Sequence, residues 1–237
     1  MELRRGAHGI VRVGHRGAAA LAPENSLAAI EAAAAHEVDA VELDVLRAPD
    51  GSLVLAHGPE VAPDAPSLDD GLALAARLGL AVQVDVKDSG VEADVVQALR
   101  RSDLLGRSFV SSCSFAVLAG FAALEPGLPR SFTYPEDRLG IAGRRLLRPA
   151  VRPGLAVLSA LLPRRLPAWL RAAGASAATL NWTVVTPATV EACHRAGAAV
   201  YVWTVNEAAL ARTLVDTNID GIITDDPRIF VGGMATS

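Results

Sequence analysis

The sequence predicts a (β/α)8 TIM barrel, and three observations carry that prediction. Short apolar runs recur eight times along 237 residues, and helix-compatible segments separate them. Strands that alternate with helices form parallel sheets, and eight such units suit a barrel, which typically takes about 250 residues. No GxGxxG fingerprint follows the first run, which reads VGHRGAAA. A doubly wound open sheet is the alternative, but it seldom needs eight regular repeats, so we expect one barrel domain over residues 1–237.

The expected elements follow from apolar runs and from the residues that start and stop helices. Ser26, Ser67, Ser114 and Asn206 stand where a helix would begin, and serine and asparagine side chains cap the free N–H groups there. Gly79 and Gly197 stand where helices would end. The expected strands are 11–15, 40–45, 81–87, 108–112, 130–134, 177–181, 199–204 and 220–224. The expected helices are 26–36, 68–78, 91–102, 114–124, a segment within 138–173, 187–196 and 206–216.

Composition limits the kind of partner and compartment. A formal charge of −4 gives no reason to expect nucleic acid as a partner. The two cysteines, Cys113 and Cys193, are too few for a disulfide framework and are interpreted as reduced core thiols. The N-terminal residues lack a continuous apolar stretch, and the longest apolar run, 154–162, is too short to span a bilayer. We therefore expect a cytoplasmic protein.

Polar residues gather where the expected strands end. In TIM-barrel enzymes the chemistry lies at the carboxyl ends of the strands, in the loops that lead into the helices. The sequence places polar or aromatic side chains at those points, and we take them as candidates for a site. They are His15, Arg16, Glu42, Asp44, Asp85, Lys87, Asn181, Trp203 and Asn206.

The stretch VELDV at 41–45 sets two carboxylates two residues apart. Residues i and i+2 of a strand point to the same face, so Glu42 and Asp44 would lie side by side, where like charges repel. With Asp85 they would suit a hard divalent cation, Ca²⁺ or Mg²⁺, which takes oxygen ligands. The alternative is a salt-bridge network in which Arg16 and Lys87 pair with the acids.

Lysine and histidine residues add to this group. Lys87 is the only lysine of the chain, and it either pairs with Asp85 or faces an anion. His15 ends the first expected strand, and His57 closes the apolar run SLVLAH. Two histidines can act as acid and base, and Arg16 with Lys87 could bind a phosphate. The residues alone thus suggest a metal-assisted phosphoester hydrolase.

The ordered motifs resemble the glycerophosphodiester phosphodiesterases over essentially the whole chain. They are HRG (15–17), PENS (23–26), ELD (42–44), His57, DVK (85–87), VWTVN (202–206) and DGIITDDP (220–227). The resemblance implies a TIM barrel that cleaves glycerophosphodiesters to glycerol 3-phosphate and an alcohol, using one divalent cation, Ca²⁺ or Mg²⁺.

The family's residue roles carry over onto matching positions. The resemblance implies that His15 and His57 are the acid–base pair and that Arg16 and Lys87 bind phosphate. It implies metal binding by the three acids, and an aromatic wall against the glycerol for Trp203, which could equally be a core residue. Residues 23–25 match the PEN motif of the family, but they could equally serve only as the loop that begins the first helix.

Three departures from the family pattern bear on the substrate. Asp85 stands where the family commonly has glutamate, and an Asp–Lys pair at this spacing also resembles the sphingomyelinase D branch, which lacks the HRG and PEN motifs. Gly58 replaces the aspartate that usually follows the second histidine. Only residues 58–65 stand where the family usually has an inserted subdomain. We therefore expect an open site that tolerates substrates with bulky alcohol groups, including lysophospholipids.

Two further alternatives for the function remain. One is a catalytically inactive barrel that binds phosphodiesters, and the other is an enzyme that releases a cyclic phosphate.

Arginines concentrate in one segment. Eight arginines and no acidic residue lie between Arg138 and Arg171. Within it, residues 144–174 alternate basic clusters with leucine and tryptophan. This segment is either a surface helix pair that extends its arginines to water or a basic amphipathic face that makes peripheral contact with an anionic membrane.

Overall fold

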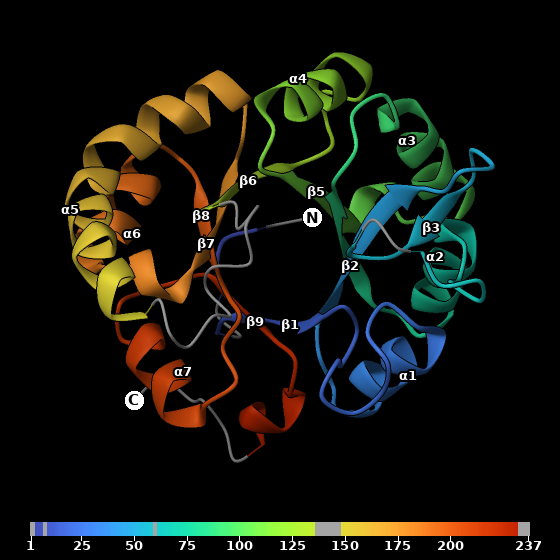
Figure 1. Ribbon diagram of the computed structural model, residues 1–237, viewed down its shortest axis with the longest axis horizontal. Helices are drawn as coiled ribbons and strands as arrows, with labels where there is room; N and C mark the ends of the chain where they lie inside the picture. The colour runs from blue at the N-terminus through green and yellow to red at the C-terminus, as the bar shows by residue number, and fades with distance from the viewer. Residues whose placement is uncertain (1–2, 7–8, 59–60, 136–147, 232–237) are drawn as a thin grey trace.

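The computed structural model describes residues 3–6, 9–58, 61–135 and 148–231, with the backbone alone for 148–158. Eight parallel strands close into a barrel, because β1 pairs with both β2 and β9 (Figure 1). The predicted fold is confirmed. In chain order the barrel strands are β1 (Val11–His15), β2 (Ala40–Arg47), β4 (Ala81–Val86), β5 (Ser108–Ser112), β6 (Arg130–Tyr134), β7 (Ala177–Asn181), β8 (Ala199–Trp203) and β9 (Gly221–Thr224).

Helices surround this barrel (Figure 1). Ser26, Ser67 and Ser114 each accept a hydrogen bond from a backbone N–H in the first turn, as their positions predicted. The expected cap at Asn206 is wrong, because Glu207 holds the N-cap position of the helix that begins at Ala208, and the Asn206 side chain donates to Asp225. The α-helices are α1 (Leu27–Ala35), α2 (Leu68–Arg77), α3 (Glu92–Arg101), α4 (Phe115–Leu124), α5 (Arg148–Ala173), α6 (Pro187–Arg195) and α7 (Ala208–Val215). Short 3-10 helices are η1 (Leu105–Arg107), η4 (Trp182–Val184) and η5 (Pro227–Phe230).

A ninth strand lies outside the barrel. β2 continues beyond the barrel to Arg47, and β3 (Leu53–Leu55) returns antiparallel to it, with Val45 opposite Leu55. The run SLVLAH is therefore the second arm of a hairpin, which a period-2 apolar pattern could not distinguish from a barrel strand. The hairpin matters for the site because His57 follows β3 directly.

The barrel interior is apolar at one end and polar at the other. Alternate strand residues point inward, and those nearest the amino ends form a small buried cluster that includes Val13, Phe109 and Tyr201. The rings of Phe109 and Tyr201 lie 5.2 Å apart, and Leu3 closes the cluster, with its carbonyl accepting a hydrogen bond from the Tyr201 hydroxyl. The inward residues nearer the carboxyl ends are polar, so the functional side chains share one end of a solid barrel.

Helix α5 carries the described part of the basic segment. Leu162, Leu166 and Leu170 are buried against the core at helical spacing, whereas Arg164 and Arg171 are exposed. Residues 144–147 lie outside the described part of the chain. This arrangement agrees with the interpretation of arginines on a surface helix, although the described backbone forms one helix here instead of a pair. None of the helices in the described ranges is long and apolar enough to cross a membrane.

Candidate active site

A tight turn after β1 brings backbone and side chains onto β2. His15 lies opposite Glu42 in the parallel register. Arg16 and Gly17 then adopt positive φ values of 51° and 86°, and a Cβ at Gly17 would stand 2.6 Å from Ala29. The turn directs the backbone N–H of Arg16 to Glu42 Oε2, at 3.0 Å. The glycine of the HRG motif is therefore required by the backbone.

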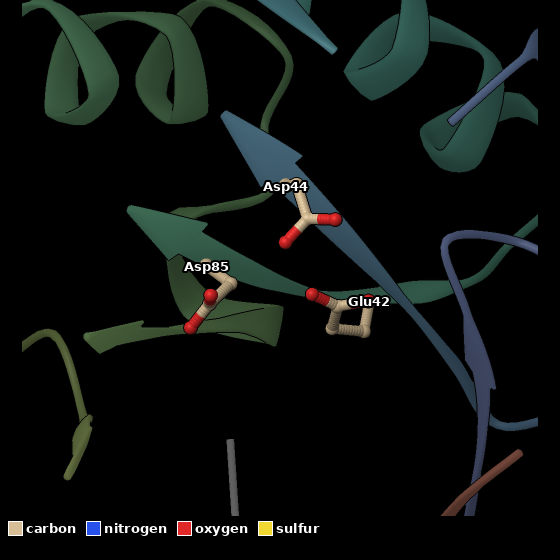
Figure 2. Close-up of side chains that lie close together, drawn as sticks. All are labelled: Glu42, Asp44 and Asp85. Carbon is tan, nitrogen blue, oxygen red and sulfur yellow. The ribbon is translucent and has the colours of Figure 1, made fainter. Parts of the chain in front are cut away.

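Three carboxylates meet at the carboxyl ends of β2 and β4 (Figure 2). Glu42 and Asp44 point to the same side of β2, and Asp44 lies opposite Asp85 of β4. One oxygen from each lies within 4.8 Å of the others, and the residues are only 4%, 1% and 6% exposed. Burial, followed by the nearby Asp44 charge, raises the pKa of Glu42 to about 7.

Asp44 is held by Asn25 on both its backbone and its side chain. The Asn25 amide nitrogen donates to Asp44 Oδ2 at 3.1 Å, and the Asn25 amide oxygen accepts from the Asp44 backbone N–H at 3.1 Å. Asn25 is 3% exposed. Residue 25 therefore does more than begin the first helix, because it links the PEN loop to the central acid of the cluster.

Asp85 is held from the opposite side by hydroxyl groups. Ser111 of β5 donates to Asp85 Oδ1 at 2.5 Å, and Thr133 of β6 donates to the same oxygen at 3.4 Å. The side-chain amide of Gln83 donates to Ser111 in turn, at 2.9 Å. Ser111 is completely buried, so the orientation of Asp85 is set by neighbouring strands. These side chains were missed in the sequence because isolated serines and threonines in strands carry no distinctive pattern.

Arg16 and Lys87 both contact the acids. The Lys87 ammonium lies 2.7 Å from Asp44 Oδ1 and also pairs with Asp85, while Arg16 Nε lies 3.0 Å from Asp44 Oδ2. Burial alone would raise the pKa of Asp44, but Lys87 and then Arg16 lower it below its ordinary value. The salt-bridge network considered from the sequence is thus present. The same three buried carboxylates are hard oxygen donors, which fit a divalent cation of the Ca²⁺ or Mg²⁺ kind.

His15 has a carboxylate partner that the sequence analysis missed. Asp225, the residue after β9, lies 2.6 Å from His15 Nδ1 through Oδ1. Burial disfavours the charged form of His15, but the hydrogen bond to Asp225 and the charge of Glu42 raise its pKa overall. Asn206 donates to the other Asp225 oxygen at 2.6 Å. The signal was available, since Asp225 ends a strand and falls within DGIITDDP.

His57 lies in a different environment. It is exposed, and within the described ranges it has no hydrogen-bond partner. Partial burial lowers its pKa, and the attraction of Asp44 only partly offsets that effect. Gly58 offers no side chain to orient the ring. The two histidines therefore differ in support, since His15 is fixed by a carboxylate and His57 is not.

A cavity of about 590 Å³ at this end of the barrel joins the candidate residues. Trp203 lines it, and its indole N–H donates to the Thr179 carbonyl at 3.3 Å. Asn181 instead caps η4 and does not line the cavity. The cavity touches every residue to which a site role was assigned from the sequence. These are His15, Arg16, Glu42, Asp44, His57, Asp85, Lys87 and Trp203.

The sequence and the fold of this chain are both similar to those of known phosphodiesterases. A model of the glycerophosphoryl diester phosphodiesterase family matches residues 15–69 and 69–229. A Mycobacterium tuberculosis protein named "Probable glycerophosphodiester phosphodiesterase 2" is 27% identical over an alignment 267 residues long, gaps included. The alignment covers 94% of this chain and 89% of the relative. A solved Oleispira antarctica phosphodiesterase in complex with the product sn-glycerol-3-phosphate is 19% identical, with a TM-score of 0.73 and coverage of 94% and 95%.

Proposed function

The chain belongs to the glycerophosphoryl diester phosphodiesterase family, and we propose that it hydrolyses glycerophosphodiesters to glycerol 3-phosphate and an alcohol with one divalent cation. The observation that carries the proposal is the single cavity that touches two histidines, three carboxylates, an arginine and a lysine. The product in the Oleispira antarctica complex supports the choice of substrate.

The cation would be held by Glu42, Asp44 and Asp85. Their oxygens lie within 4.8 Å of one another, and each carboxylate is buried. Ca²⁺ and Mg²⁺ both suit such oxygen ligands and keep positions for water and substrate. When bound, the cation would supply positive charge that offsets the charge of the phosphodiester.

The histidines would move the protons of the reaction. His57, with a lowered pKa, is neutral near pH 7 and can accept the proton of the attacking water. His15, with a raised pKa and a carboxylate behind its Nδ1, can donate a proton to the leaving alcohol oxygen. Their environments thus separate a base from an acid.

Arg16, Lys87 and Trp203 would bind the substrate. Arg16 and Lys87 provide the positive charge beside the acids, and a guanidinium suits phosphate oxygens in pairs. The Trp203 ring lines the cavity wall, where it could contact the glycerol.

The first test measures glycerol 3-phosphate release from glycerophosphocholine and glycerophosphoethanolamine with Ca²⁺, Mg²⁺ or EDTA. We expect release that EDTA abolishes and a divalent cation restores. Release that continues undiminished in EDTA would contradict the metal requirement. No release with either cation would move the search to lysolipid substrates and cyclic products, and failure of those as well would favour a barrel that binds phosphodiesters without turnover.

The alternative substrates are lysophospholipids and sphingomyelin-like diesters. They remain under consideration because His57 is exposed and only a short segment separates it from Ser67, which bears on the alcohol group that the site can accept. Phosphorus NMR of the products separates hydrolysis from release of a cyclic phosphate. Membrane contact through 144–174, a cytoplasmic location and a single domain over 1–237 stay predictions.

Replacing Asp225 with asparagine tests the support of His15. We expect kcat to fall by up to about 10⁴-fold, because a carboxylate that fixes the tautomer and orientation of a catalytic imidazole can contribute that much. Asn206 still contacts residue 225 in this variant, so the loop should keep its position. The double variant with His15→Ala should be no slower than His15→Ala alone, since residues that act as a unit are not additive. Independent, additive losses would contradict the positioning role.

A further inference from the structure

One oxygen of each site carboxylate is already committed to a protein donor. These donors belong to the backbone or to well-buried side chains, which surrounding residues hold in place. The committed oxygens are Glu42 Oε2 with the Arg16 N–H, Asp44 Oδ2 with Asn25, and Asp85 Oδ1 with Ser111. The remaining oxygens are Glu42 Oε1, Asp44 Oδ1 and Asp85 Oδ2, one from each acid.

The Lys87 ammonium contacts two of these three remaining oxygens. It lies 2.7 Å from Asp44 Oδ1 and pairs with Asp85 Oδ2. An ammonium has donors only, so it cannot share an oxygen lone pair with a metal ion, and two positive charges at such distances repel strongly. The Lys87 ammonium and a divalent cation would therefore compete for the same two carboxylate oxygens.

We propose that a divalent cation and the Lys87 ammonium are alternative occupants of Asp44 Oδ1 and Asp85 Oδ2, so that cation binding releases the ammonium into the cavity. This inference rests on the proposed metal-dependent function. Lys87 is suited to the exchange because it follows the last residue of β4, is 31% exposed at its side chain, and has a flexible four-carbon stem.

The exchange would couple metal loading to phosphate binding. While Lys87 pairs with two carboxylates, its charge is neutralised by them and is weakly available to an anion. Once displaced, the same charge can face the phosphate. Because coupling between two ligands is reciprocal, a bound phosphodiester should also favour the cation.

The chain offers a direct probe, since Lys87 is its only lysine. Protein grown with ¹³C,¹⁵N-lysine therefore gives one set of lysine side-chain signals. Titration with Mg²⁺, and separately with Ca²⁺, should shift the Cε and Nζ resonances over the concentrations at which calorimetry detects cation binding. Bound cation with an unmoved lysine resonance would overturn the proposal.

A second readout, which does not depend on enzymatic activity, is the cation affinity of the Lys87→Met variant measured by calorimetry. We expect this variant to bind Mg²⁺ or Ca²⁺ about tenfold more tightly than the native protein, because no ammonium has to leave. Arg101→Met is the matched control: it removes one positive charge from an exposed pair with Asp69, outside the cavity, and should leave affinity unchanged. Equal or weaker binding by Lys87→Met would overturn the exchange.

The outcomes separate this inference from the proposed function. Cation-dependent release of glycerol 3-phosphate, with an unmoved lysine signal, would reject the exchange alone. Absence of cation binding by both native protein and Lys87→Met would reject the exchange together with metal dependence. The lysine spectrum uses the native protein, so the test holds even if Lys87→Met folds poorly.

Discussion

Replacing His15 by alanine is expected to lower kcat for glycerol 3-phosphate release by about 10²–10⁴-fold, the range that general acid–base groups supply. The imidazole lines the cavity beside the acids and is fixed by Asp225, and the substitution removes the group proposed to donate the proton. His57→Ala should cause a loss in the same range, because the base would be removed. Initial rates at saturating substrate and cation measure both effects.

His36→Ala is the matched control for these variants. His36 follows α1, where its ring contacts the Ala32 carbonyl at 2.9 Å, and it does not line the cavity. Its replacement should leave kcat within about twofold of the native value, as expected for a substitution away from the reacting groups. A His15→Ala enzyme that kept more than a tenth of native activity would contradict the proposed proton donor.

Replacing Glu42 by glutamine is expected to stabilise the metal-free protein at pH 8 while abolishing its response to the cation. Burial and the adjacent Asp44 raise the pKa of Glu42 from 4.5 to about 7. Because the folded-state pKa lies above the unfolded value, ionisation of Glu42 lowers stability as pH rises from 4.5 through 7. Glutamine resembles the protonated acid and does not ionise, so the gain at pH 8 should reach up to about 3 kcal/mol.

The cation should largely offset this difference in stability between the native protein and the variant. In the native protein, a cation at 100 times its Kd adds about 2.7 kcal/mol, which corresponds to a Tm increase of about 5–10 °C for a chain of this size. Glu42→Gln should show little of that increase. Glu191→Gln, on the exposed face of α6, is the control and should respond as the native protein does. Thermal unfolding at pH 5 and pH 8, with and without cation, decides the matter; an unchanged cation response in Glu42→Gln would contradict the ligand assignment.

Much of the barrel could be predicted because each βα unit is a local pattern. The apolar runs at 11–15, 108–112, 130–134 and 177–181 coincide with strands, and serine caps mark the helix starts within a residue. Local geometry also explains why VELDV predicts two acids on one face, since alternation in a strand needs no tertiary information. The hairpin arm β3 was not distinguished, because its direction depends on which strand it pairs with.

The support of the site could not be predicted in the same way. Asp225 and His15 are separated by 210 residues, and Ser111 and Asp85 by 26, so their contacts exist only when the barrel closes in one register. Closure between β1 and β9 brings the last strand to the first histidine, and the pairing of β4 with β5 sets Ser111 opposite Asp85.

The sequence by itself determined the eightfold alternation of strands and helices and the end of the barrel that carries polar groups. It also determined which two histidines, three acidic residues and two basic residues are candidates for the site. Only the tertiary structure decided which partners hold these side chains and which carboxylate oxygens the backbone, Asn25 and Ser111 occupy. The physical reason is that side-chain direction is a local property of a strand, whereas hydrogen-bond partners depend on register and closure between strands far apart in the chain.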